Sequence, residues 1–184
     1  MKTLQSWGLG LLVLGIVVGA SGAAFIYSGI YNIGADAPHT RPVYWLIEKM
    51  RDRSVTVRAA SIDVPPLDDS DLLLSGGPDY AEMCSGCHLE PGVNRSEIRD
   101  GLYPQPPDLT ERSDRAPAEV FWAIKHGIKL SAMPAWGPTH TDERIWAMVA
   151  FINRLPDLTP DQYQILTVRQ PGGEGHQHGS DAHE

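Results

Sequence analysis

The chain opens with a long apolar segment, whereas every later hydrophobic pattern is shorter and amphipathic. No charged residue lies between Lys2 and Asp36, and residues 9–31 are mostly apolar or small. A helix that crosses a bilayer needs about 20 apolar residues, and Trp7 and Tyr27 suit its two interfaces. The pattern therefore predicts one N-terminal transmembrane helix, the anchor, within residues 1–34.

A cleaved signal peptide is the alternative interpretation of this segment. Residues 20–24 are small enough for a cleavage site, but the apolar run continues through Phe25, Ile26 and Ile30. The apolar part of a signal peptide is only about 7–15 residues long. The length of the run therefore favours an anchor that stays on the protein.

A second helix is predicted at residues 42–55. Its apolar positions recur with helical spacing. They are Val43, Leu46, Ile47 and Met50. The helix either lies on the membrane surface, through Tyr44 and Trp45, or packs against the domain that follows. Residues 61–70 are rich in Pro and Asp and read as a linker, so residues 35–67 form a membrane-proximal helix and linker.

The compact domain is predicted at residues 68–158, and it contains the clearest helical patterns. Residues 118–128 and 141–155 both show the helical period, and Thr141 can cap the second helix. The buried stripe of that helix is predicted to be Ile145, Met148, Val149 and Ile152. No run of alternating strand patterns occurs, so the expected fold class is all-α.

The last segment, residues 159–184, is predicted to be an extension that ends in a polar tail. Three histidines lie in this tail: His176, His178 and His183. The tail either captures a metal such as copper or nickel, or is simply solvated.

The charge is distributed unevenly. The net charge is −8, but residues 1–62 carry an excess of basic residues, whereas residues 63–170 and 171–184 are acidic. An acidic domain argues against a nucleic-acid partner. The composition is globular, and two cysteines are too few for a disulfide scaffold.

Both cysteines lie in the segment CSGCH, in which Cys84 and Cys87 are followed at once by His88. This is the C-x-x-C-H pattern of c-type haem attachment. Two thiols on one helical turn can add to the two vinyl groups of one haem, and the next residue can bind the iron through its imidazole. The pattern therefore predicts one covalently attached haem c with His88 as an axial ligand.

The two thiols have three alternative uses. A thioredoxin-like dithiol requires a βαβ setting that the pattern does not predict. A structural zinc site needs four ligands, and no second cysteine pair exists. A simple disulfide is the third alternative.

The second axial ligand is predicted to be Met133. This residue lies in an irregular loop between two predicted helices, and Pro134 stiffens the chain beside it. Such a loop can bring a thioether over the haem face opposite His88. The other candidates are Met83, Met148, His126 and His140.

Four segments together resemble a bacterial membrane-anchored class I c-type cytochrome. They are YAEMCSGCH, GLYPQPPDL, IKHGIKLSAMPAWG and DERIWAMVAFINRL, within residues 76–157. The resemblance implies a small all-helical fold around one haem, held by His88 and Met133. It also implies that the carbonyl of Pro106 or Pro107 holds the His88 ring.

Other implications of the resemblance concern single residues. Trp136 either hydrogen-bonds a haem propionate or only packs. Gly76 and Tyr80 resemble the pair at which the first helix of the family crosses the last helix, near Trp146. Pro78 departs from the pattern and puts the course of that first helix in doubt.

A His–Met pair fills both axial positions, so the predicted function is single-electron transfer rather than bond-making chemistry. The expected partners are membrane redox complexes: a quinol-oxidising donor and an oxidase or reductase acceptor, with the bilayer bound through residues 9–31. Because the family attaches haem outside the cytoplasm, the haem domain is expected in the periplasm, on a single-pass inner-membrane protein. The alternatives are a fixed subunit of a terminal oxidase or reductase, and a haem peroxidase or gas-binding protein.

Overall fold

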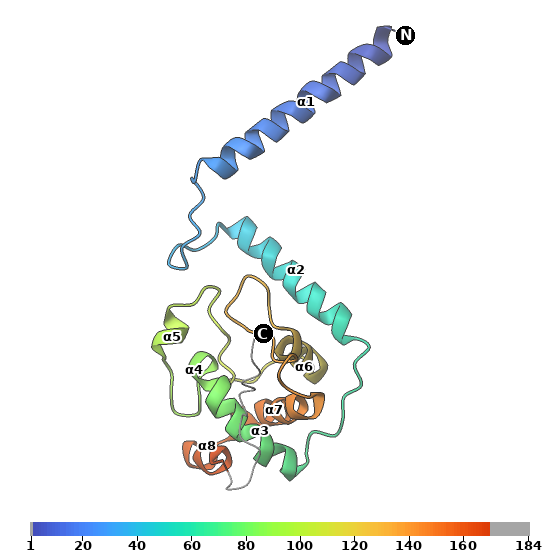
Figure 1. Ribbon diagram of the computed structural model, residues 1–184. Helices are drawn as coiled ribbons and strands as arrows, with labels where there is room; N and C mark the ends of the chain where they lie inside the picture. The colour runs from blue at the N-terminus through green and yellow to red at the C-terminus, as the bar shows by residue number, and fades with distance from the viewer. Residues whose placement is uncertain (1, 170–184) are drawn as a thin grey trace, which may run out of the picture. The chain divides into compact units, whose positions relative to one another are not determined.

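The computed structural model describes residues 2–169, and these residues form helices and loops without a strand (Figure 1). The predicted all-α fold class is therefore confirmed. The chain divides into two units, of which the first ends at Pro38 and the second begins at His39. The predicted His-rich tail, with His176, His178 and His183, lies outside the described residues.

The first unit contains the helix α1 (Lys2–Tyr27). Its stretch Trp7–Tyr27 has a mean hydropathy of 2.4, and none of it is buried within the protein. Its 21 residues span about 31 Å, enough for a hydrocarbon core of about 30 Å. The apolar run was predicted to reach residue 31, but the helix ends earlier because Gly29 adopts a left-handed φ of 64°.

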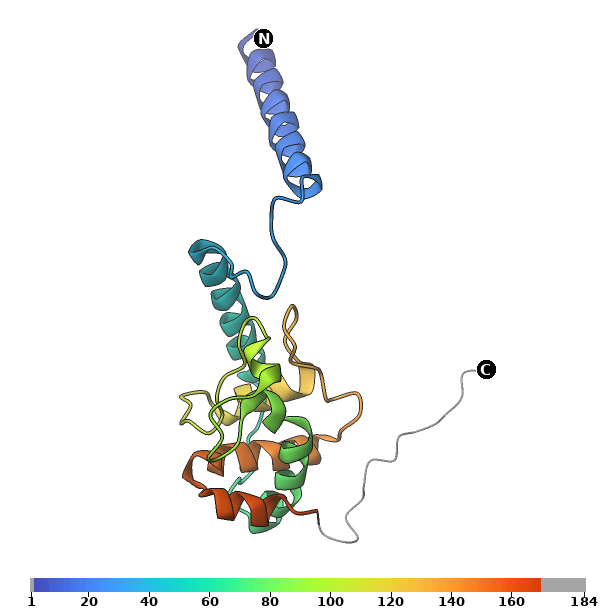
Figure 2. The ribbon, with the colours of Figure 1, turned by 90° about the vertical axis from the view of Figure 1, so that its left-hand side faces the viewer.

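The second unit begins with α2 (Arg41–Ala59), which the pattern predicted at residues 42–55. Its C-terminal half packs on α6 (Pro117–His126) and buries Val55 and Ala59 (Figures 1 and 2). Its N-terminal half leaves large apolar side chains exposed: Tyr44, Trp45, Leu46, Ile47 and Met50. Packing against the domain, one of the two predicted positions, is therefore observed for the C-terminal half.

The helices α3 (Ser70–Met83) and α7 (Asp142–Arg154) cross at the centre of the second unit. A Cβ atom added to Gly76 would lie 2.1 Å from the carbonyl oxygen of Ala147, so only glycine permits this crossing. Pro78 lies inside α3 without ending it. The predicted crossing of the first and last family helices is thus observed, beside Trp146.

The two other predicted helices are confirmed with small differences at their ends. The helix predicted at 141–155 is α7, and the Thr141 hydroxyl accepts a hydrogen bond from the Arg144 amide at 3.4 Å. The helix predicted at 118–128 is α6, which stops at His126 because Gly127 turns the chain. Short helices α4 (Ser85–His88) and α5 (Glu97–Asp100) follow α3.

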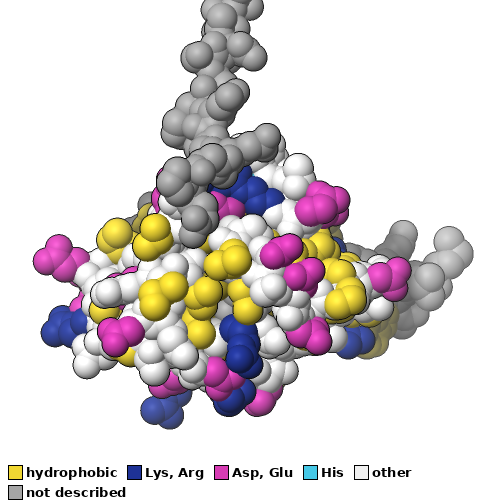
Figure 3. Space-filling model, turned by 90° about the horizontal axis from the view of Figure 1, so that it is seen from below, with side chains coloured by type: hydrophobic (Ala, Val, Ile, Leu, Met, Phe, Trp, Pro, Cys, Tyr) yellow, Lys and Arg dark blue, Asp and Glu magenta, His cyan; other side chains and the backbone are white. Residues whose placement is uncertain are grey.

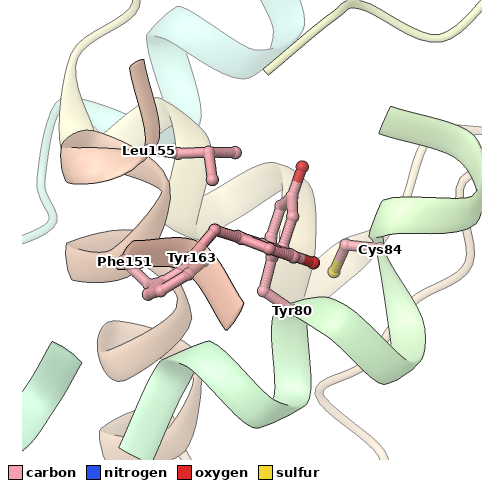
Figure 4. Packing of buried hydrophobic residues seen from close by; sticks show 5 residues of the cluster. All are labelled: Tyr80, Cys84, Phe151, Leu155 and Tyr163. Atoms are coloured by element: carbon pink, nitrogen blue, oxygen red, sulfur yellow. The ribbon is translucent and has the colours of Figure 1, made fainter. Parts of the chain in front are cut away.

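The chain after α7 forms two elements that the hydrophobic pattern did not predict. They are the 3₁₀ helix η1 (Leu155–Asp157) and the helix α8 (Pro160–Thr167), which packs on α3. Thr159 and Gln162 form a capping box at its start. Figure 4 shows Tyr163 of α8 beside Tyr80 of α3, with the ring centroids 6.3 Å apart. The helix is short and buries a single side chain, so it leaves little periodicity in the sequence.

The face of the second unit that Figure 3 shows carries acidic and basic side chains dispersed among apolar ones. No field of a single charge covers this face.

Candidate functional site

The two cysteines and His88 lie on one tight turn after α3. Cys84 ends α3 and its carbonyl accepts hydrogen bonds from the amides of Cys87, at 3.1 Å, and His88, at 2.9 Å. Leu89 then adopts a left-handed φ of 68° and ends α4. The three side chains are therefore held on one turn, with Cys84 buried, Cys87 and His88 half-buried, and no disulfide between the thiols.

The environment of Cys84 is apolar. Its sulfur lies next to the aromatic cluster of Tyr80, Phe151 and Tyr163 (Figure 4). Burial raises the pKa of the Cys84 thiol to about 12. The free thiol is therefore protonated at neutral pH and is not a preformed thiolate for redox exchange.

The ring of His88 is oriented by one backbone carbonyl. Its Nδ1 lies 2.9 Å from the carbonyl oxygen of Pro107, so Nδ1–H donates and Nε2 keeps a lone pair for a metal. Burial lowers the pKa of this imidazole, which favours the neutral, ligating form. The structure thus selects Pro107; the carbonyl of Pro106 instead accepts a bond from Arg99 at 3.2 Å.

These side chains open into a cavity of about 670 Å³. Cys84, Cys87 and His88 line it together with Met133. Much of the remaining lining is apolar, including Leu109, Val120, Ile124, Ile128 and Ile152. Cofactor sites are typically apolar cavities of about 300–1,000 Å³. Two thiols, an imidazole and a thioether around one such cavity fit a flat macrocycle that is attached through sulfur and ligated at its metal.

The loop that carries Met133 folds back over the end of α6. The amides of Trp136 and Gly137 donate to the carbonyls of Ile124, at 3.0 Å, and Lys125, at 2.9 Å. The Met133 carbonyl accepts a hydrogen bond from the Ile128 amide at 3.1 Å. The loop is irregular, but its backbone is held in place and presents the thioether to the cavity.

The five candidate axial ligands differ in whether they line the cavity. Met83 and Met133 line the cavity. Met148 is fully buried in the core between α6 and α7, as its place on the helix stripe indicates. His126 is exposed at the end of α6 and contacts Trp122, and His140 packs against Trp136; neither histidine lines the cavity.

Trp136 lines the same cavity and packs against the cluster of Ile124, Ile145 and Met148. Its ring lies 5.3 Å from that of His140 in an edge-on arrangement. Packing is therefore observed, and a hydrogen bond to a haem propionate stays a prediction.

Two residues of α2 also line the cavity, Arg51 and Val55. The sequence did not identify them, because they lie 33 and 29 positions before Cys84. The periodicity of the apolar residues in this segment indicates a helix, but it does not indicate which surface of the domain the helix covers.

The zinc and dithiol uses of the two thiols need features that residues 2–169 do not show. Within residues 2–169, no cluster of three or more His, Cys, Asp or Glu side chains could hold a metal ion by itself. The same residues form no strand, so the βαβ setting of a thioredoxin-like dithiol is not present in them.

Comparison with protein families shows what the second unit is similar to. Residues 72–152 match the family of cytochrome c oxidase, cbb3-type, subunit III. The matched segment includes the cysteine turn, the Met133 loop and most of α7, and it excludes α1, α2 and α8. A comparison with curated proteins gave no match.

Proposed function

We propose that this chain, whose residues 72–152 are a cytochrome c domain that binds haem c and carries electrons, is a membrane-tethered single-electron carrier. Its donor is a quinol-oxidising complex and its acceptor is an oxidase or reductase. The observation that carries the proposal is the convergence of Cys84, Cys87, His88 and Met133 on one cavity.

The roles of the four residues follow from their chemistry. Cys84 and Cys87 would hold the haem covalently, since each S–H can add across a vinyl group without a leaving group or an oxidant. His88 would offer Nε2 to the iron, because its Nδ1–H is engaged by the Pro107 carbonyl. Met133 would offer its thioether sulfur to the same iron.

This ligand pair determines the kind of reaction. An imidazole and a thioether bound together would leave the iron no position for a substrate, and the thioether would raise the reduction potential. An apolar lining from residues such as Ile124 and Ile128 keeps water away from the iron. Such a site supports electron transfer without binding a substrate at the metal.

The membrane location rests on α1. The stretch Trp7–Tyr27 is long and apolar enough to cross a bilayer. With an uncleaved anchor and a periplasmic haem domain, the protein is a single-pass inner-membrane protein. A tether of this kind keeps the carrier near membrane complexes at high effective concentration.

A second candidate is a fixed electron-entry subunit of a terminal oxidase. It is favoured by the family match, because that family is named for a subunit of the cbb3-type oxidase. Purification in mild detergent distinguishes a fixed subunit from a free carrier. A fixed subunit co-purifies with a catalytic complex at constant ratio, and a free carrier does not.

The test of haem attachment uses the full-length protein purified in detergent. Intact mass should exceed the polypeptide mass by one haem, and the absorption spectrum should change reversibly with reductant. Cys87→Ala should leave a single thioether and poor haem retention, whereas Ser85→Ala should retain haem. A purified protein with the bare polypeptide mass and no haem absorption would contradict the proposal.

A further inference from the structure

Two arginines from distant parts of the chain share one carboxylate beside the cavity. Arg51 Nε and Nη2 donate to Asp52 Oδ1 at 2.9 and 2.8 Å. Arg115 Nη2 donates to the same oxygen at 2.8 Å. Arg51 belongs to α2, outside the segment that matches the cytochrome family, whereas Arg115 precedes α6 within it.

The arginines face the cavity, and the carboxylate does not. Arg51 and Arg115 are among the residues that line the cavity, whereas Asp52 is not. One carboxylate oxygen cannot satisfy two guanidinium groups, which each carry several N–H donors in a fixed fork. Arg51 Nη2 also lies 3.6 Å from Glu48 Oε1. Asp52 therefore holds the two guanidinium groups together, and each keeps N–H donors that Asp52 does not accept.

The other two arginines of the lining are engaged with different groups. Arg99 Nε donates to the Pro106 carbonyl, and Arg112 pairs with Asp157. Only Arg51 and Arg115 are joined through a shared partner. They form a paired cationic site in a cavity whose lining is mostly apolar and also includes Asp108, Glu111 and Glu119.

We propose that Arg51 and Arg115 bind the propionate carboxylates of haem c, so that α2 forms one wall of the haem site. This inference rests on the proposed function, since the group in the cavity is the haem. Arginine matches carboxylates in charge and in planar geometry. Val55, one turn after Arg51, is 3% exposed and also lines the cavity, so α2 supplies apolar cover beside the cation.

The proposal has an electrostatic consequence that packing alone does not have. A positive charge near the iron stabilises the reduced, less positive haem. Loss of either arginine should therefore lower the midpoint potential. It should also raise the propionate pKa, which moves the pH dependence of the potential toward higher pH.

The experiment is a redox titration of the haem-loaded full-length protein at several pH values. Arg51→Gln and Arg115→Gln should each change the reduction equilibrium constant by roughly tenfold toward the oxidised form. Arg51→Lys keeps the charge and should restore most of the potential. Arg53→Gln is the matched control, since Arg53 is exposed on the same helix and does not line the cavity.

The outcomes separate this inference from the proposed function. Potentials of Arg51→Gln and Arg115→Gln that equal the Arg53→Gln value at every pH would overturn the inference, even if their melting temperatures fell. A lower midpoint potential in only one of the two variants would overturn the proposal that both arginines bind the propionates. Wild-type protein that carries no haem would instead contradict the proposed function.

Discussion

Gly127 lies directly against the backbone of the loop that presents Met133. A Cβ atom added at residue 127 would approach the Met133 carbonyl oxygen to 2.8 Å, and Gly127 has a φ of 65°. Both the close approach and the left-handed conformation require glycine. The end of α6 and the position of the candidate thioether ligand are therefore coupled through one residue without a side chain.

Gly127→Ala should displace the Met133 loop and weaken the bond between its sulfur and the haem iron. Gly127 combines a φ of 65° with a ψ of −178°, a region that is essentially restricted to glycine and costs an alanine about 1–3 kcal/mol, and the contact with backbone atoms adds to this. The measurements are the near-infrared sulfur-to-iron absorption band and the melting temperature. Gly101→Ala is the control, because the nearest atom to an added Cβ there is 3.6 Å away. An unchanged band in Gly127→Ala would refute the coupling.

Substitution of the two cavity methionines should identify the axial ligand. Met133→Ala should leave the haem attached but remove the near-infrared band and allow carbon monoxide to bind the reduced iron. Met83→Ala should keep the band, because Met83 precedes Cys84 on the attached side of the haem. The reverse result would assign the ligand to Met83.

The ion pair between Asp79 and Arg144 should be a major contributor to stability. Asp79 is 3% exposed, and its carboxylate accepts two bonds from Arg144 at 2.5 and 2.7 Å. Asp79→Asn leaves the guanidinium without its carboxylate and should cost roughly 2–4 kcal/mol in unfolding free energy.

Asp157→Asn provides the comparison for that measurement. Asp157 pairs with Arg112, whose side chain is 76% exposed. Exposed pairs contribute about 0–1 kcal/mol, so this variant should unfold close to the wild type in denaturant. Equal losses in the two variants would show that burial of the Asp79 pair adds nothing.

The Asp52 carboxylate should make the stability depend on pH. Burial alone would raise its pKa, but the hydrogen bonds from Arg115 and Arg51 outweigh burial and hold the pKa below its ordinary value. Two other acidic side chains lie on these helices: Glu48 Oε1 is 3.6 Å from Arg51 Nη2, and Glu119 accepts a hydrogen bond from the Thr56 hydroxyl at 2.6 Å.

The direction of this effect follows from the lowered pKa. The ionised carboxylate stabilises the fold fully above the unfolded-state value of about 3.9, and the contribution is lost as pH falls through the lower folded-state value. The melting-temperature difference between wild type and Asp52→Asn should therefore be constant above about pH 5 and shrink below about pH 4. A difference that stays unchanged down to pH 3 would rule out this role.

The amino-acid sequence by itself determined the features that depend on neighbouring residues. The apolar run of α1, the cap of α7 and the placement of Cys84, Cys87 and His88 on one turn all follow from spacings within a few residues. Of the predicted stripe of α7, Ile145, Met148 and Val149 are buried, whereas Ile152 is half-buried. Local geometry imposes these features on the chain, so periodicity and motif spacing were sufficient to predict them.

Tertiary structure alone decided which distant residues meet. The tertiary structure places the Pro107 carbonyl, rather than that of Pro106, beside His88, and it packs the unpredicted α8 on α3. It also brings Arg51 and Arg115 to the same carboxylate, that of Asp52. The spacing of residues along the chain carries no information about such contacts, because they depend on how whole helices cross. The close approach of Gly76 to Ala147 sets one such crossing, and the position of the helices around the cavity follows from crossings of this kind.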